Sequence, residues 1–86
     1  MYKIIYSSQA QKDAKKVNQL GLKNNIQKII EILQNNPYQN PPPYEKLLGD
    51  LTGSYSRRIN IQHRIIYQIY EKDKIVKIIR MWTHYE

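Results

Sequence analysis

The pattern of apolar and polar positions predicts a helical N-terminal half and a strand-rich C-terminal half. Residues 2–7 form a short β-branched and aromatic run, which is typical of a strand. Ser7 or Ser8 can then cap a helix, because a serine hydroxyl accepts from the unpaired N–H groups of a first turn. That helix carries apolar side chains along one side at Ala10, Ala14, Val17 and Leu20. It should end before Gly21, since glycine readily adopts the left-handed conformation found after helices.

A second helix is predicted by a single apolar stripe. The stripe consists of Leu22, Ile26, Ile29, Ile30 and Leu33. The sequence Asn35-Asn36-Pro37 should end this helix. Because the connection to the first helix is short, we expect the two helices to pack as an antiparallel hairpin.

Residues 37–54 hold all four prolines and two of the three glycines. The run Pro41-Pro42-Pro43 should be extended, because each ring fixes φ and disfavours helix in the residue before it. We interpret this run as a stiff arm that delivers Tyr44 and Glu45 to the sheet.

The remainder of the chain predicts three strands, at residues 55–60, 64–70 and 74–82, with a hairpin turn at 71–73. An even hairpin loop places Arg64 opposite a position near Met81. The helix-covered face should then hold Ile65, Tyr67, Ile69, Val76 and Ile78. Strict alternation points His84 away from Arg64, so a shared site requires a bulge or chain break near residues 81–83.

Composition narrows the classes of function. The chain has 86 residues, which predicts one domain over residues 1–86. Its net charge of +7 favours a polyanion or an acidic protein as partner, although a soluble basic surface explains the charge equally well. Cysteine is absent, which excludes disulfides and thiolate metal sites. We expect no membrane contact, since no apolar run suits a membrane span or a signal peptide, and therefore a soluble, cytoplasmic protein.

Four residues of the C-terminal half form a set suited to cutting RNA without a metal or cofactor. The 2′-hydroxyl of RNA can attack the neighbouring phosphate when a base, an acid and cations assist. Glu45 can be the base, and His84 the acid, because an imidazole can carry a proton near neutral pH. Arg64 can hold the phosphate oxygens, and Tyr85 can donate a hydrogen bond or stack on a base.

Each of these residues also has an ordinary structural interpretation. Glu45 can be a solvated loop acid, and Arg64 a strand residue paired with Glu71 or Asp73. His63 is expected to face away from Arg64 and to be structural. His84 and Tyr85 can be a frayed terminus.

The order of these residues resembles a known family. The pattern Leu51-Thr52-Gly53-x-Tyr55-Ser56-Arg57-Arg58-Ile59, then His63-Arg64-x-x-Tyr67 and the terminal His84-Tyr85, is similar to the YoeB/Txe toxins of the RelE superfamily. The resemblance implies an α+β fold of the microbial RNase type, with two N-terminal helices packed on a twisted, mainly antiparallel sheet. It also implies cleavage of mRNA in the A site of the 70S ribosome.

The resemblance assigns roles residue by residue. It makes Glu45, Arg64, His84 and Tyr85 catalytic, and gives the pair Arg57-Arg58 contacts to RNA or ribosome. It further implies an acidic YefM-like antitoxin as partner, and toxin homodimers are common in the family.

Two positions depart from the family pattern. Leu48 stands where a lysine is usual, and Trp82 where an arginine is usual, two residues before the histidine. Lys46 and Arg80 are each displaced by two positions and are the candidate replacements for RNA binding. Trp82 itself can stack on a base or form an edge of the core.

Two alternatives remain open at this point. The first keeps the fold without the nuclease chemistry, as in the ParE toxins that act on DNA gyrase. The second is a non-catalytic, basic RNA- or ribosome-binding protein. Both predict that His84 and Glu45 can be replaced at little functional cost.

Overall fold

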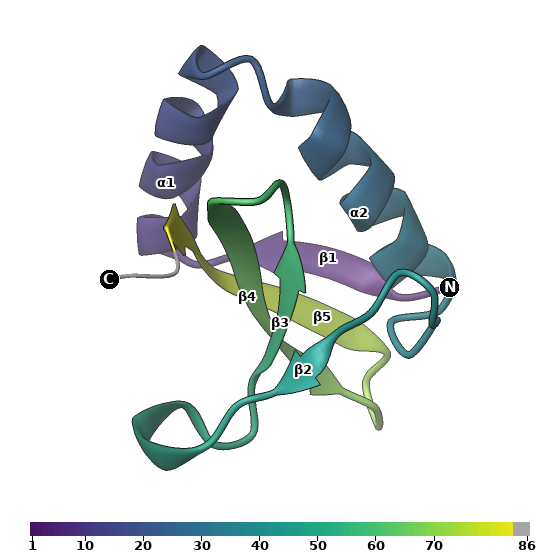
Figure 1. Cartoon of the computed structure of the whole chain (residues 1–86). Helices are drawn as coiled ribbons and strands as arrows, with labels where there is room; N and C mark the ends of the chain where they lie inside the picture. The colour runs from purple at the N-terminus through teal and green to yellow at the C-terminus, as the bar shows by residue number, and fades with distance from the viewer. Residues whose placement is uncertain (84–86) are drawn as a thin grey trace.

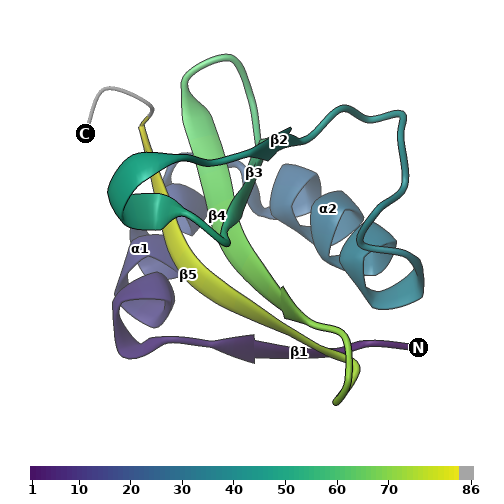
Figure 2. The ribbon, with the colours of Figure 1, turned by 90° about the horizontal axis from the view of Figure 1, so that it is seen from below.

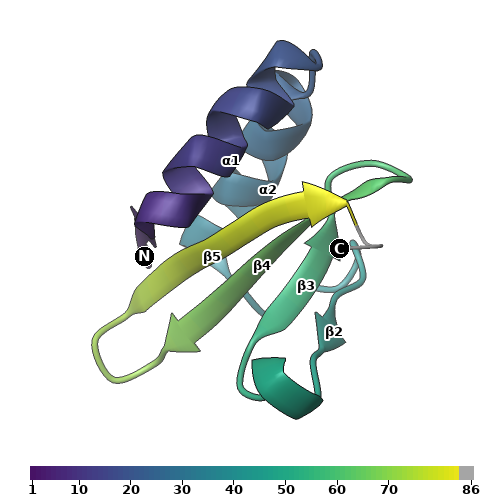
Figure 3. The same ribbon diagram turned by 90° about the vertical axis from the view of Figure 1, so that its left-hand side faces the viewer.

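The computed structural model describes residues 1–83 and shows a twisted five-stranded sheet with both helices on one face (Figures 1 and 3). Along the chain the elements are β1 (Lys3–Tyr6), α1 (Ser8–Gln19), α2 (Lys23–Asn35), β2 (Glu45–Lys46), the 3-10 turn η1 (Gly49–Leu51), β3 (Tyr55–Arg58), β4 (His63–Tyr70) and β5 (Ile75–Thr83). The strand order is β1-β5-β4-β3-β2. Of the pairs among these strands, β1 with β5 is parallel and the rest are antiparallel, so the predicted α+β fold is confirmed.

Local signals set the helix ends as expected. The Ser7 hydroxyl accepts from the Ala10 N–H at 3.0 Å and caps α1. Gly21 follows with φ of 80°, a conformation that glycine adopts without steric cost. Helix α2 ends at Asn35, two residues before the buried Pro37.

The two helices run in opposite directions but diverge from their connection (Figure 1). Helix α1 packs mainly on β5, while α2 lies beside β1. The expected close helical hairpin is therefore wrong in its packing, because each helix turns its apolar stripe to the twisted sheet rather than to the other helix. In the described residues, neither helix is long and apolar enough to cross a bilayer.

The core lies between the helices and one face of the sheet, as the strand alternation predicted. Ile65, Tyr67, Val76 and Ile78 are all fully buried there, and Ile69 packs at the margin. On the helix side they meet Ala10, Val17, Ile26, Ile29 and Leu33. Ile66 is also buried, but it points to the opposite face, because successive residues of a strand alternate between faces.

A bulge shifts the β4–β5 register. Ile66 is opposite Arg80, whereas Tyr67 is opposite Ile78, so Ile79 is the extra residue. Beyond the bulge, Arg64 is opposite Trp82, one residue from Met81, near which it was expected. A bulge was predicted near residues 81–83 on the condition that Arg64 and His84 share a site. The observed bulge lies earlier, at Ile79, and His84 is outside the described residues, so the shared site stays a prediction. The Ser7 hydroxyl donates to the Ile79 carbonyl at 2.8 Å, which ties the bulge to the start of α1.

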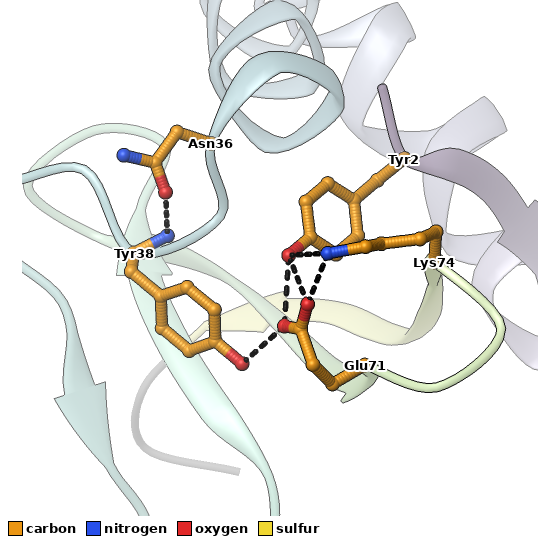
Figure 4. Close-up of polar contacts among 5 residues, drawn as sticks. All are labelled: Tyr2, Asn36, Tyr38, Glu71 and Lys74. Carbon is orange, nitrogen blue, oxygen red and sulfur yellow. Dashed lines mark hydrogen bonds and ion pairs between the residues drawn. The ribbon is translucent and has the colours of Figure 1, made fainter.

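A polar cluster around Glu71 joins three distant segments at the end of the sheet (Figure 4). The Glu71 carboxylate accepts from the Tyr2 hydroxyl at 2.7 Å and the Tyr38 hydroxyl at 3.1 Å, and it also pairs with Lys74. The hydrogen bond from Lys74, followed by that from Tyr2, holds the pKa of Glu71 below its usual range. The cluster therefore joins the residue before β1 and the proline segment to the predicted turn between β4 and β5.

The proline segment is not the straight arm that its sequence predicted. The chain bends at Pro41 and Pro42, where the Asn40–Pro41 and Pro41–Pro42 peptide bonds are cis. It still ends in β2, which pairs with β3 and so brings Glu45 to the edge of the sheet.

Candidate functional site

A cleft of about 280 Å³ opens on the face of the sheet away from the helices. Its lining residues are Glu45, Leu47, Leu51, Ser56, Arg64, Ile66 and Trp82. Figure 2 shows β2 and the η1 turn on the near side of the sheet, with the helices behind it. Strand register builds this cleft, because Glu45 is opposite Ser56, Ser56 is opposite Ile66, and Arg64 is opposite Trp82.

Glu45 and Arg64 form the polar centre of the cleft. Arg64 Nη1 lies 3.3 Å from Glu45 Oε1 and also donates to the Ser56 hydroxyl at 3.2 Å. The Arg64 side chain is 17% exposed, whereas that of Glu45 is 64% exposed. The pair therefore presents a solvent-facing carboxylate beside a largely buried cation, and the alternative pairing of Arg64 with Glu71 or Asp73 is wrong.

The protein leaves part of the Arg64 guanidinium without a partner. Within residues 1–83, its buried Nε makes no hydrogen bond, and both bonds to Glu45 and Ser56 come from Nη1. Arginine presents its N–H donors in a planar fork that matches the oxygens of an anion. The cleft thus places a cation next to a carboxylate that is open to solvent, and the buried Nε of that cation has no partner within residues 1–83.

Arg57 has a structural position that sequence analysis did not anticipate. It is 1% exposed and donates to the Tyr67 hydroxyl and to the carbonyls of Pro37, Gln39 and Pro42, at 2.6–3.0 Å. Burial raises the pKa of Tyr67 to about 12, which keeps this acceptor a neutral phenol. The prediction that Arg57 contacts RNA is wrong for this fold, because the guanidinium is enclosed and holds the proline segment.

The other predicted RNA-binding residues lie around the cleft rather than in it. Arg58 is exposed at the end of β3, where it makes one long hydrogen bond of 3.4 Å to the Ile61 carbonyl. Lys46 follows Glu45 in β2 and so points to the opposite face of that strand. Leu48 is 85% exposed and adds no charge. The structure therefore does not place Lys46 beside Glu45 as a substitute for the missing lysine.

Arg80 points to α1 instead of the cleft. Its Nε donates to Asp13 Oδ2 at 2.8 Å, and its guanidinium lies over the Trp82 ring, 4.2 Å from the ring centre. Asp13 is 5% exposed and was missed by sequence analysis. A signal was present, because Asp13 falls three residues after Ala10 and four before Val17, on the inward stripe of the helix.

Two further predicted residues, His84 and Tyr85, lie outside the described residues. Of the four proposed catalytic residues, the described structure thus brings together Glu45 and Arg64. His63 is not in this cleft; its Nδ1 lies 3.2 Å from Asn60 Oδ1 in the loop between β3 and β4. Residues 1–83 contain no group of three His, Cys, Asp or Glu side chains placed to hold a metal ion.

Comparison with known proteins agrees with this fold. Residues 4–85 match the family described as "YoeB-like toxin of bacterial type II toxin-antitoxin system". A Toxin YoeB of Synechocystis sp. is 32% identical over 69 residues, covering 80% of this chain and 78% of that protein.

Solved structures of toxins have the same fold. The YoeB–YefM toxin–antitoxin complex of Staphylococcus aureus matches with a TM-score of 0.80 and 32% identity, covering 99% of both chains. YafQ of E. coli has the same fold, with a TM-score of 0.82 at 22% identity over 99% of this chain and 96% of that one. Since the family match spans nearly the whole sequence, the chain belongs to the YoeB-like toxins of bacterial type II toxin–antitoxin systems.

Proposed function

We propose that this toxin is a metal-independent endoribonuclease that cleaves mRNA in the A site of the ribosome and so inhibits translation in the cytoplasm. The observation that carries the proposal is the pairing of an exposed Glu45 carboxylate with a largely buried Arg64 guanidinium at 3.3 Å in one cleft. Attack by a 2′-hydroxyl needs a general base to remove its proton and a cation to bind the phosphate. Glu45 and Arg64 are groups of these two kinds.

The proposed reaction uses each group once. Glu45 removes the proton of the 2′-hydroxyl, whose oxygen then bonds to the adjacent phosphorus. Arg64 donates to the non-bridging oxygens as negative charge grows on them. His84 protonates the departing 5′-oxygen, and Tyr85 donates a hydrogen bond or stacks on a base. The products are a 2′,3′-cyclic phosphate and a 5′-hydroxyl.

The basic surface would hold the mRNA and the ribosome. The net charge is +7, and Arg58 lies exposed at the end of a strand that borders the cleft. Neutralising phosphates with such side chains supplies sequence-independent affinity for RNA. Lys46 and Arg80 remain candidates for such contacts at the periphery, while the enclosed Arg57 is not one.

We also propose a YefM-like antitoxin as the regulatory partner. The S. aureus relative is described in a complex with YefM. An antitoxin with an acidic tail would complement the positive charge of this chain and could cover the Glu45–Arg64 cleft. The formation of a toxin homodimer stays a prediction.

The proposal is tested by mapping mRNA 5′ ends in a translation extract with wild type, Glu45→Gln and His84→Gln. Cuts within A-site codons that disappear in both variants are expected. Asp50→Asn serves as the matched control, because Asp50 is an exposed acid in η1 that does not line the cleft.

Two results would contradict the proposal. Translation arrest without cuts, unchanged in the variants, would indicate a non-catalytic ribosome-binding protein. An absence of any effect on translation would instead favour a gyrase poison of the ParE type.

A further inference from the structure

Trp82 separates two hollows on the surface. It lines the cleft that contains Glu45 and Arg64, and it also lines a second hollow of about 320 Å³ together with Asp13 and Arg80. Trp82 and Arg64 are directly opposite each other in β4 and β5, a relation that places their side chains side by side on one face. The indole is thus next to the group proposed to hold the scissile phosphate.

Arg80 covers the indole from the side of the second hollow. Its guanidinium carbon is 4.2 Å from the ring centre, well within the distance of a cation–π contact. Arg80 does not line the Glu45 cleft, whereas Trp82 does. The ring surface that borders the cleft is therefore not occupied by Arg80.

Asp13 fixes this arrangement from α1. Its Oδ2 accepts from Arg80 Nε at 2.8 Å and from the Met81 N–H at 3.0 Å, so one carboxylate oxygen holds both residues that precede Trp82. Its Oδ1 accepts from Gln9 at 2.9 Å. A buried carboxylate with three hydrogen bonds is rigidly placed, and Trp82 follows directly from the segment it holds.

We propose that Trp82 stacks on a nucleobase of RNA in the Glu45 cleft, and that Asp13, acting through Arg80, is the positioning residue that holds the indole for this contact. The proposal rests on the proposed function and adds a base-binding site to it. Leu47, Leu51 and Ile66 give the cleft apolar walls, which suit the flat face of a base rather than its phosphate. A base attached to the ribose at Glu45 lies within reach of the residue opposite Arg64.

The protein contains one tryptophan, so its fluorescence reports directly on this site. The probe is an RNA trinucleotide with 2′-O-methyl groups, which lacks the nucleophile of the proposed reaction and cannot be cut. We expect saturable quenching of the wild-type emission as the base stacks on the indole. Asp13→Asn, which keeps one acceptor oxygen for Met81 and Arg80 but loses the charge and the acceptor for Gln9, should shift the emission of the free protein and weaken the trinucleotide affinity.

Arg80→Met should act in the same direction as Asp13→Asn, because it removes the cation above the ring. Complete loss of one base–aromatic stack weakens binding roughly 5- to 150-fold. The loss of trinucleotide affinity in Asp13→Asn and Arg80→Met should not exceed this range. Lys12→Ala is the matched control on α1, since Lys12 is exposed next to Asp13 and faces solvent. Circular dichroism must show that all variants are folded.

Cleavage in the translation extract provides a second measurement. Trp82→Phe should keep most of the activity, whereas Trp82→Leu should raise KM with a smaller change in kcat. Equal effects of Phe and Leu would overturn the stacking role. Unquenched wild-type emission, or unchanged emission and affinity in folded Asp13→Asn, would overturn the proposal even if the protein cuts mRNA. Conversely, quenching that follows the expected order without any cleavage would support base binding and contradict the nuclease.

Discussion

Arg57 lies against Tyr44, with its guanidinium carbon 4.9 Å from the centre of the tyrosine ring. Tyr44 directly precedes Glu45, so this contact, together with the bonds to the carbonyls of Pro37, Gln39 and Pro42, fixes the path by which Glu45 reaches the cleft. A buried cation on β3 thus determines where the carboxylate on β2 lies. The adjacent arginines of the sequence have separate tasks, one inside the protein and one on its surface.

Replacing Arg57 by methionine should destabilise the protein by about 2–4 kcal/mol, because buried carbonyl groups lose their donors. The measurement is urea unfolding followed by circular dichroism. Arg58→Met is the matched control and should change the free energy of unfolding by less than about 0.5 kcal/mol, since Arg58 is exposed. Similar losses for both variants would show that Arg57 does not hold the proline segment.

Glu45→Gln should lower the cleavage rate about 10²–10⁴-fold, the usual contribution of one general base. The free energy of unfolding should hardly change, because Glu45 is 64% exposed and a solvent-exposed ion pair contributes little. Single-turnover cleavage on programmed ribosomes and thermal unfolding measure the two effects. A drop in stability that parallels the drop in rate would mark Glu45 as structural.

Because of Asp13, the free energy of unfolding should depend on pH in the acidic range. Burial alone would raise the pKa of Asp13, but hydrogen bonds from Gln9, from the Met81 N–H and from Arg80 outweigh it and hold that pKa below its usual range. The Asp13 carboxylate therefore binds a proton more weakly in the folded protein than in the unfolded chain. The stabilisation is complete above the unfolded value of about 3.9 and is lost as the pH falls through the lower folded value.

Urea unfolding of wild type and Asp13→Asn at a series of pH values tests this linkage. The wild type should be more stable at neutral pH, and the difference between the two should shrink as the pH falls below about 4. A difference that does not depend on pH would show that the charge of Asp13 is not what stabilises the fold.

Arg58→Ala should weaken binding to ribosomes or single-stranded RNA. Loss of one phosphate contact flattens the dependence of log K on log salt by about 0.7 for a single strand. Binding measured at several salt concentrations gives the slope, and Lys3→Ala is a control, since Lys3 is an exposed cation on β1 at the other edge of the sheet. An unchanged slope for Arg58→Ala would argue against a phosphate contact.

Deleting residues 84–86 should abolish cleavage and leave most antitoxin affinity in place, if the antitoxin binds mainly the body of the toxin. Toxicity in cells and co-purification with a YefM-like antitoxin measure the two effects. Loss of the complex would show instead that the antitoxin binds residues 84–86.

Local sequence signals predicted much of the fold and part of the site. Ser7 and Gly21 act within one helical turn, so their roles as cap and stop could be predicted without tertiary information. Glu45 and Arg64 were proposed as site residues because a carboxylate after a proline run and an arginine in a strand fit one chemistry. Their closeness, however, depends on the pairing of β2 with β3 and of β3 with β4.

The errors came from contacts between distant segments. Arg57 and Arg58 look alike in sequence, and only alternation along β3 puts one of them inside. The bulge at Ile79 is held by contacts with α1 and its N-cap, because Ser7 donates to the Ile79 carbonyl and Asp13 accepts from the Met81 N–H. No window of neighbouring residues contains that information.

The pairing of β1 with β5 has a consequence for how the protein folds. Lys3 is opposite Ile75, so the first strand of the sheet is completed only by the last one. Pairings between segments so far apart in sequence carry a large loop-closure cost and slow folding. The core under α1, which packs on β5, therefore forms only once the C-terminal hairpin has returned to the first strand. Folding of the two halves of the chain is in this way coupled into one event.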